Sequence, residues 1–341
     1  MKTTIPFPAF CLVTAFFAQA AFADRIVPLE GRPINGTILL MNETKVSIDT
    51  GGGKKEEIAA NKIESTSFDG EPSALGSARA AVKGGRSSDA LEYLQKVDPK
   101  KLPDNPYLKQ DYEYLLASVK GMLAMSDSSD AKEAENALAL FIKSNQRNYH
   151  YYDAVQIYGD LLVSRGKFEQ AKKAYEVLSK APWPEYNLKA RVALGNTLIS
   201  EKKIADARKN FEEVAASGES TPDAEAQKQL AQVGIARCLI GEKKSEDAVK
   251  LLEEIASKAN PENTLLQAAV YSTLGSAYET SSKNSNAIVA YTSVDVLYPS
   301  AGPDHIASLR ALSGLWRKTG RIDRAEAVEK KLKDLYNLDV K

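Results

Sequence analysis

One pair of small residues recurs along this chain at a fixed separation. In each pair a glycine is followed twelve residues later by an alanine, and the pairs fit a repeat of 34 to 40 residues. The pairs are Gly159 with Ala171, Gly195 with Ala207, and Gly275 with Ala287. Self-similarity at this period is typical of stacked helical hairpins, because one two-helix unit cannot bury its apolar faces alone. The repeat therefore predicts a stack of helices.

The segment around the last pair resembles a tetratricopeptide (TPR) repeat. Its residues follow the pattern W-x2-L-G-x2-Y…A-x3-F…P with conservative changes. They are Tyr271, Leu274, Gly275, Tyr278, Ala287, Tyr291 and Pro299. The resemblance implies a mainly α fold, a TPR-type α-solenoid of about seven helical hairpins over residues 73–341. It also implies a binding scaffold rather than an enzyme.

The recurring glycines indicate close helix packing. Glycine inside a helix costs about 1 kcal/mol relative to alanine, so three glycines in one register favour a packing role. We expect glycine in the first helix and alanine in the second to let the two backbones approach closely. An aromatic residue follows each alanine by four positions and is expected to pack toward the next hairpin. These aromatic residues are Tyr175, Phe211 and Tyr291.

The other repeats fit this register less well. Gly234 and Ala248 match only if the turn before the second helix is two residues longer, and Gly314 falls one place late. Nearer the N-terminus, Ala90 is assigned to the second helix of a first unit, and Ala137 with Phe141 to that of the next.

Residues 24–72 have a different pattern. The segments 34–41 and 44–49 are rich in β-branched residues and are separated by turn-forming residues such as Asn42-Glu43. We expect four or five short antiparallel strands in a small β-barrel-like module, which resembles SH3-like or Sm-like modules. A module of this size buries little apolar surface. It should therefore pack on the helices or pair with another chain, and we favour packing on the helices.

Residues 1–23 have the pattern of a secretory signal peptide. Lys2 precedes an almost wholly apolar run from residue 5 to residue 22, and Ala21-Phe22-Ala23 is a small-x-small cleavage signal. A cut after Ala20 is the alternative. Prolines interrupt the run, which disfavours an uncleaved membrane anchor. We expect export to a periplasm or cell envelope.

The composition excludes several partner classes. The chain has 45 basic and 45 acidic residues, which gives no general attraction to nucleic acid. No second apolar stretch is long enough to span a membrane, so no integral span is expected after signal cleavage. Cleavage would leave Cys238 as the single cysteine, which cannot form an internal disulfide.

No catalytic or metal motif stands out. The two histidines, His150 and His305, are far apart in the sequence, and no nucleophile elbow, P-loop or dinucleotide-binding motif is present. We expect no enzyme activity, no cofactor and no metal, with His150 as a surface residue without a functional role.

The expected function is binding of a protein or peptide partner. In the TPR family, partners commonly lie in the concave groove along the first helix of each unit. The groove positions carried over by register are Gln156, Asp160, Ser164, Lys189, Val192, Asn196, Ser200, Ser272, Ser276 and Glu279. The alternative is a structural spacer, or a self-associating envelope component that forms a homodimer through the β-module. Glycan binding is disfavoured because the β-module has no aromatic platform.

Overall fold

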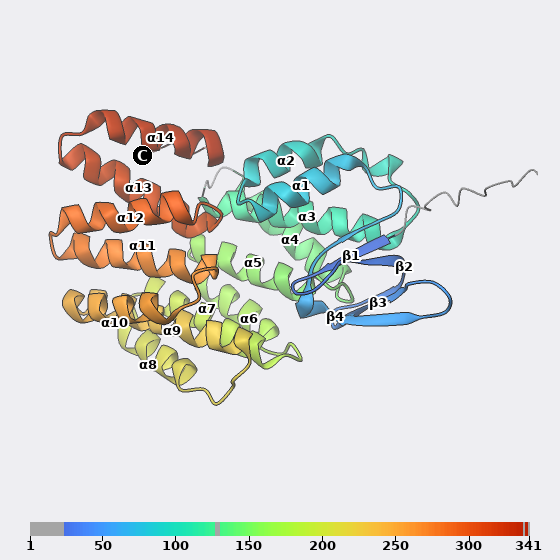
Figure 1. Cartoon of the computed structure of the whole chain (residues 1–341), viewed down its shortest axis with the longest axis horizontal. Coiled ribbons are helices and arrows are strands. Elements are labelled where there is room, and N and C mark those ends of the chain that lie inside the picture. Colours follow the sequence, from blue (N-terminus) through green and yellow to red (C-terminus); the bar gives the residue numbers. More distant parts are fainter. Residues whose placement is uncertain (1–23, 127–129, 337, 340–341) are drawn as a thin grey trace, which may run out of the picture.

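The computed structural model describes residues 24–126, 130–336 and 338–339. In these residues a five-stranded antiparallel sheet is followed by fourteen α-helices stacked as antiparallel hairpins (Figure 1). The predicted mainly α solenoid behind a small antiparallel β-module is therefore confirmed. The expected signal peptide, residues 1–23, lies outside the described residues.

The boundaries of the elements are as follows. The strands are β1 (Asp24–Pro28), β2 (Ile34–Met41), β3 (Lys45–Asp49), β4 (Lys55–Ala59) and β5 (Ile63–Ser67). The helices of the first four hairpins are α1 (Ser73–Lys83), α2 (Ser87–Gln95), α3 (Pro106–Ser126), α4 (Ala131–Ser144), α5 (Tyr151–Ser164), α6 (Phe168–Leu178), α7 (Pro184–Ser200) and α8 (Ile204–Ala215). Those of the last three are α9 (Pro222–Gly241), α10 (Ser245–Lys258), α11 (Thr264–Thr280), α12 (Asn284–Leu297), α13 (Gly302–Lys318) and α14 (Ile322–Tyr336).

Six of the seven hairpins share one turn, and the turn of the α3–α4 hairpin falls partly outside the described residues. Each shared turn has three residues, of which the middle one has a positive φ and the third is basic. The turns are Gly84-Gly85-Arg86, Arg165-Gly166-Lys167, Glu201-Lys202-Lys203, Glu242-Lys243-Lys244, Ser281-Ser282-Lys283 and Thr319-Gly320-Arg321. In each, the third residue donates its N–H to a carbonyl five residues back, as Lys244 does to Leu239 over 2.8 Å. This Schellman-type bond satisfies a carbonyl at the end of the first helix.

The constant turn corrects the repeat register. Counting back seven residues from the positive-φ residue gives Gly159, Gly195 and Gly275 in three hairpins, but Ala236 and Ser313 in two others. The turn with two extra residues expected near Gly234 is therefore wrong, as is the alignment on Gly314.

The second hairpin also needs a correction. Every second helix carries its buried alanine at its fourth residue, which in α4 is Ala134 rather than Ala137. A Cβ added to Gly121 of α3 would lie 2.7 Å from a methyl group of Leu138, so Leu138 rather than Phe141 occupies the position four residues after the alanine.

The glycines receive bulky side chains of their own hairpin. A Cβ on Gly159 would lie 2.5 Å from the ring of Tyr175, and a Cβ on Gly275 would overlap the ring of Tyr291. The glycine of the same hairpin leaves the space that each tyrosine ring fills. Each ring also packs toward the next hairpin, because Tyr175 shares a core with Ala190 of α7 and Tyr291 shares one with Ile306 of α13. The third ring, Phe211, lies against Gly195 of its own hairpin and Gly234 of the next, since a Cβ added to either glycine would lie 2.5 Å from the ring.

The alanines of the register are buried, but they are not the side chains that the glycines face. Ala171 of α6 and Ala207 of α8 are both fully buried, as a packing role requires. The side chains nearest to a Cβ on Gly159 or Gly195 nevertheless belong to residues later in the second helix, and neither alanine is among them. The glycines make room for rings, and each alanine fills a separate place in the core of its hairpin.

Lys243→Gly is expected to stabilise the protein. Lys243 has a φ of 64°, a left-handed conformation in which the Cβ of a lysine is strained. The same turn position is glycine at Gly166 and Gly320. Removing the Cβ should raise the free energy of unfolding by about 0.5–1 kcal/mol in chemical denaturation, after the entropy that glycine adds to the unfolded chain. Lys244→Gly is the control, because Lys244 has a φ of −101° and gains nothing. An equal gain in both variants would contradict the prediction.

The β-module packs against the helices. Its sheet has the order β4-β3-β2-β1-β5, and shifts of register at Val27/Pro28 and at Ile38/Leu40 curl it. Its apolar side chains share one core with α1, α2 and α3. The segment after β4 also reaches α7 and α9, since Asn61 bonds to Glu185 and Lys62 pairs with Asp223.

A buried polar cluster fixes the module to the first hairpins. Asp111 of α3 is 1% exposed and accepts from Arg79 of α1 at 2.6 Å, and Arg79 also donates to Glu71 in the segment between sheet and helices. On its other oxygen Asp111 contacts Nε2 of His150 at 3.1 Å. The hydroxyl of Tyr149 bonds to that of Thr66 in β5. His150 is thus buried, and its expected surface position is wrong.

The two ends of the helical stack meet. A Cβ on Gly85, in the α1–α2 turn, would lie 3.0 Å from the backbone of Ser300, just before α13. The last helix, α14, contacts α2 (Figure 1). The concave side of the solenoid is therefore enclosed on this side by contact between its first and last hairpins.

Candidate partner-binding surfaces

The inner side of the stack contains a cavity of about 410 Å³ whose lining includes both apolar residues and polar or charged side chains. It is lined by the first helices of successive hairpins, α5, α7, α9 and α11, and by the start of α13. Six of the predicted groove residues line it, namely Gln156, Asp160, Lys189, Val192, Asn196 and Ser200. We call this space the inner cavity.

Arg237 of α9 joins three other hairpins across the inner cavity. Its Nε donates to Thr273 of α11 at 3.2 Å, and its Nη1 donates to Asn196 of α7 at 3.3 Å. Its Nη2 lies 3.7 Å from a carboxylate oxygen of Asp304 at the start of α13. One guanidinium thus links the walls of the cavity.

In the correct register, the position of Arg237 in the sequence indicates that it faces the inner cavity. Asp160 and Asn196 each follow the small residue of their first helix by one position. Arg237 follows Ala236 in the same way. Alignment on Gly234 places Ile235 there instead, and no groove residue was predicted in this hairpin.

The charges of the inner cavity are only partly compensated. Burial raises the pKa of Asp160, although the Tyr175 hydroxyl, 2.7 Å away, and the charge of Lys189 oppose the shift. Burial likewise raises the pKa of Asp304 against the opposing charge of Arg237. For both carboxylates, burial therefore destabilises the ionised form more than the neighbouring groups stabilise it. Additional N–H donors would stabilise the ionised form.

The remaining predicted groove residues lie elsewhere. Ser272 does not line the inner cavity, but it lies near Asp304 and acts to lower the pKa of that carboxyl. Ser164 donates its hydroxyl to the carbonyl of Leu161, and Glu279 accepts from the Tyr291 hydroxyl at 3.2 Å. Neither these two residues nor Ser276 lines the cavity.

Some residues predicted for repeat packing lie in the core of a hairpin, and one also lines the inner cavity. Ala171 and Ala207 do not line the inner cavity, because both are fully buried inside their hairpins. Tyr175, which was also predicted for packing, does line it. Its ring fills the space at Gly159 while its hydroxyl donates to Asp160, so this residue serves both the core and the cavity wall.

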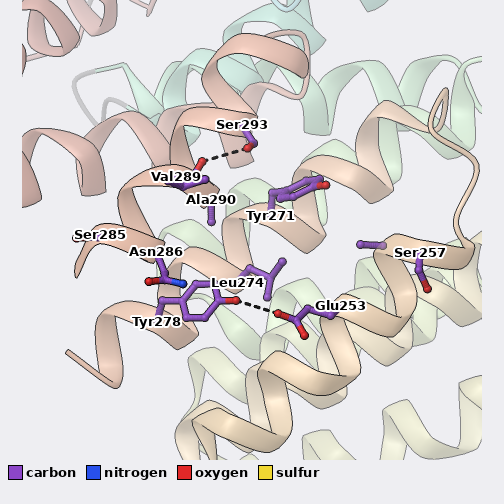
Figure 2. A pocket seen from close by; sticks show the side chains of 11 residues that line it. Glu253, Ser257, Tyr271, Leu274, Tyr278, Ser285, Asn286, Val289, Ala290 and Ser293 are labelled. Carbon is purple, nitrogen blue, oxygen red and sulfur yellow. Dashed lines mark hydrogen bonds between the residues drawn. The ribbon is translucent and has the colours of Figure 1, made fainter. Parts of the chain in front are cut away.

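A second depression lies on the outer side. It measures about 590 Å³, with α10 and α12 as walls and α11 as floor (Figure 2). Tyr271, Leu274 and Tyr278 form the floor, and the Tyr278 hydroxyl donates to Glu253 of α10 at 3.0 Å. Val289 of α12 stands at its rim. We call this space the outer groove. Tyr271 and Tyr278 were matched to the TPR pattern from the sequence, but the outer groove was not predicted.

Both histidines lie in buried contacts between helices. His305 is 1% exposed and contacts the Tyr336 hydroxyl at 2.6 Å and Asp295 at 3.0 Å, so both ring nitrogens are used in packing the last hairpins. Within residues 24–126, 130–336 and 338–339, no group of three or more potential metal ligands converges. In the same ranges no helix is both long and apolar enough to cross a membrane.

The stacked hairpins and their glycine–alanine register give the fold of a TPR-type α-solenoid with a small N-terminal β-module. No protein-family model and no curated protein matches the sequence. Among solved structures, a tetratricopeptide repeat protein from Parabacteroides merdae is 16% identical over 77% of this chain and 92% of its own, with a TM-score of 0.43. A thermophilic TPR protein of Thermus thermophilus is 20% identical over 55% of this chain and 93% of its own, with a TM-score of 0.41. These similarities concern the fold alone.

Proposed function

We propose that this chain is an exported, non-enzymatic scaffold that binds an extended segment of a partner protein in its inner cavity. The observation that carries the proposal is Arg237, which holds side chains of three other hairpins around this cavity. A space assembled from several repeats can follow an extended chain along the stack.

The chemistry of the cavity suits a peptide. An extended peptide presents unpaired N–H and C=O groups, and the cavity offers amide, carboxylate and cationic side chains to both. Asp160 and Asp304 are acceptors for N–H groups, while Lys189 and Arg237 are donors for carbonyls. The volume of about 410 Å³ is in the range of small-ligand sites, so it admits a short segment rather than a folded domain.

Export is proposed on the N-terminal pattern. The expected cleavage site after Ala23 falls directly before β1, in which the Asp24 carboxylate accepts the N–H groups of Ile38 and Asp69. Cleavage there would keep every residue that the structure describes in the mature chain. Fractionation of the native cells with N-terminal sequencing tests this, and a cytoplasmic chain that still carries residues 1–23 would contradict it.

The binding proposal is tested by site-specific photo-crosslinking in the native cells. A photoreactive amino acid at Asn196, inside the cavity, should capture a partner segment, which mass spectrometry then identifies. The same group at Lys209, on the exposed side of α8, should not capture it. Capture at both positions, or at neither, would contradict the proposal.

The identified segment then allows a quantitative prediction. As a synthetic peptide it should bind wild-type protein, and Arg237→Ala should weaken that binding at least about tenfold, because the cavity loses its central donor. Arg191→Ala is a matched control, since Arg191 pairs with Glu213 near the surface and does not line the cavity. Isothermal titration calorimetry measures all three affinities. Equal weakening by both substitutions would place the peptide elsewhere.

A further inference from the structure

The second helices of the hairpins differ in the charge of their outer faces. Each of the others exposes at least one charged residue, for example Glu92 on α2, Lys132 on α4, Lys173 on α6 and Glu254 on α10. The exposed residues of α12 carry no charge and are Ser285, Asn286, Val289, Val296 and Leu297. The one acidic residue of α12, Asp295, is paired with His305 and Lys331 of the last hairpin.

The uncharged face of α12 is also apolar. Val289 is 67% exposed and Val296 is 65% exposed, seven residues further on, so both lie on one side of the helix. Ser293 lies between them, and its hydroxyl donates to the carbonyl of Val289 at 3.0 Å (Figure 2). Because that donor is already used, Ser293 can be covered by an apolar surface at little cost. The face is therefore a ridge that gains from leaving water.

A hollow lies directly beside this ridge. The outer groove shares Val289 and Ser293 with the ridge and is floored by Tyr271 and Leu274. In a two-fold dimer both copies use the same surface, so that surface must be complementary to itself. A face that carries both a ridge and a hollow meets this requirement. The missing charge on α12 favours the same occupant, since a charged ridge would meet its own charge in the partner. The charged residue that lines the groove, Glu253 on the α10 wall, accepts a hydrogen bond from Tyr278.

We propose that a second copy of this chain binds here, with α12 of each copy set against the outer groove of the other. Ser293, midway along the ridge, then lies close to the two-fold axis. The contact differs from the homodimer expected through the β-module, whose apolar side chains are packed on α1 to α3. It uses residues outside the inner cavity and does not depend on the proposed function.

Sedimentation velocity of the full chain over a range of micromolar concentrations tests the pair. Wild type should sediment as a dimer. Val289→Glu with Val296→Glu should raise the dimer dissociation constant at least about 100-fold, because it places like charges on the axis. Leu140→Glu with Ile322→Glu is the matched control, since it charges two exposed apolar residues away from α12 and should leave the dimer intact. Circular dichroism checks that both double variants are folded.

A second measurement locates the axis. Ser293→Cys, combined with Cys11→Ser, should form a covalent dimer under mild oxidation, while Cys238 is buried and should not react. A wild-type monomer at all concentrations would overturn the proposal. An unchanged dimer in Val289→Glu with Val296→Glu, or a Ser293→Cys chain that stays uncrosslinked, would overturn it as well. None of these results bears on peptide binding in the inner cavity.

Discussion

Replacing Phe211 with alanine is expected to lower the free energy of unfolding by about 3–5 kcal/mol. The ring is fully buried and lies between two first helices, against Gly195 of its own hairpin and Gly234 of the next. Its removal opens a cavity that both hairpins share, and rigid helices cannot close it. Chemical denaturation followed by circular dichroism measures the loss. Leu140→Ala, at a side chain that is 65% exposed, should change little by comparison.

The same contact predicts a compensating pair of substitutions. Gly195→Ala alone should cost about 1–3 kcal/mol, although alanine favours helix, because the added Cβ would lie 2.5 Å from the Phe211 ring. In the α9–α10 hairpin the corresponding buried residues are Ala236 and Leu252. The double variant Gly195→Ala with Phe211→Leu should therefore be more stable than the two single losses predict. If the losses of the two single variants simply added in the double variant, residues 195 and 211 would not be matched in size.

Arg79→Ala is expected to cost about 3–5 kcal/mol, because it leaves the Asp111 carboxylate buried without its main cation. Asp111 is 1% exposed, and Arg79 is the charged partner that lies 2.6 Å away. Thermal and chemical denaturation should both show the loss. Arg86→Ala, at an exposed pair with Asp89, should cost no more than about 1 kcal/mol. Similar losses in the two variants would show that the buried cluster contributes nothing special.

The same cluster predicts how stability changes with pH. Burial acts to raise the pKa of Asp111, but the charges and hydrogen bonds of Arg79 and His150 outweigh it and hold that pKa below its usual value. A carboxyl with a lowered folded-state pKa adds stability above its unfolded pKa of about 3.9, and this stability is lost as pH falls through the folded value. The difference between wild type and Arg79→Ala should therefore shrink in acid. A difference that stays constant down to acid unfolding would contradict this account.

The interior of each hairpin could be predicted from the sequence wherever glycine marked it. Gly159, Gly195 and Gly275 fixed the register, because a glycine within a helix indicates close contact and the turn that follows has constant length. Where alanine or serine takes the glycine's place, as at Ala236 and Ser313, the signal is lost among ordinary helical residues. That loss shifted the register in α9, so Arg237 was not matched to Asp160 and Asn196, which hold the same position in their helices.

The contacts inside a hairpin were less predictable than its register. Spacing alone placed Ala171 and Ala207 at buried positions, because the period of a helix fixes which residues face the core. It could not decide that Tyr175 and Phe211, rather than these alanines, would face the glycines. That choice depends on the direction in which each long side chain leaves its helix, and spacing does not record it.

The binding surfaces were harder to predict for a different reason. Six predicted groove residues line one cavity, since residues at the same helical position of neighbouring repeats fall side by side. Ser276 and Glu279 have the same register but do not line it. Which repeats share a cavity depends on how strongly the stack curves, and curvature accumulates from small rotations at every interface.

The sequence by itself determined the local architecture of this protein: strands first, then antiparallel helices with a repeated turn, because those features depend on residues that are near in the chain. Only the tertiary structure decided that Gly85 meets Ser300 and that the β-module rests on α1 to α3. It also decided that α12 keeps an uncharged face in water. Such contacts join residues far apart in sequence, and their geometry is the sum of many packing interfaces that no local pattern encodes.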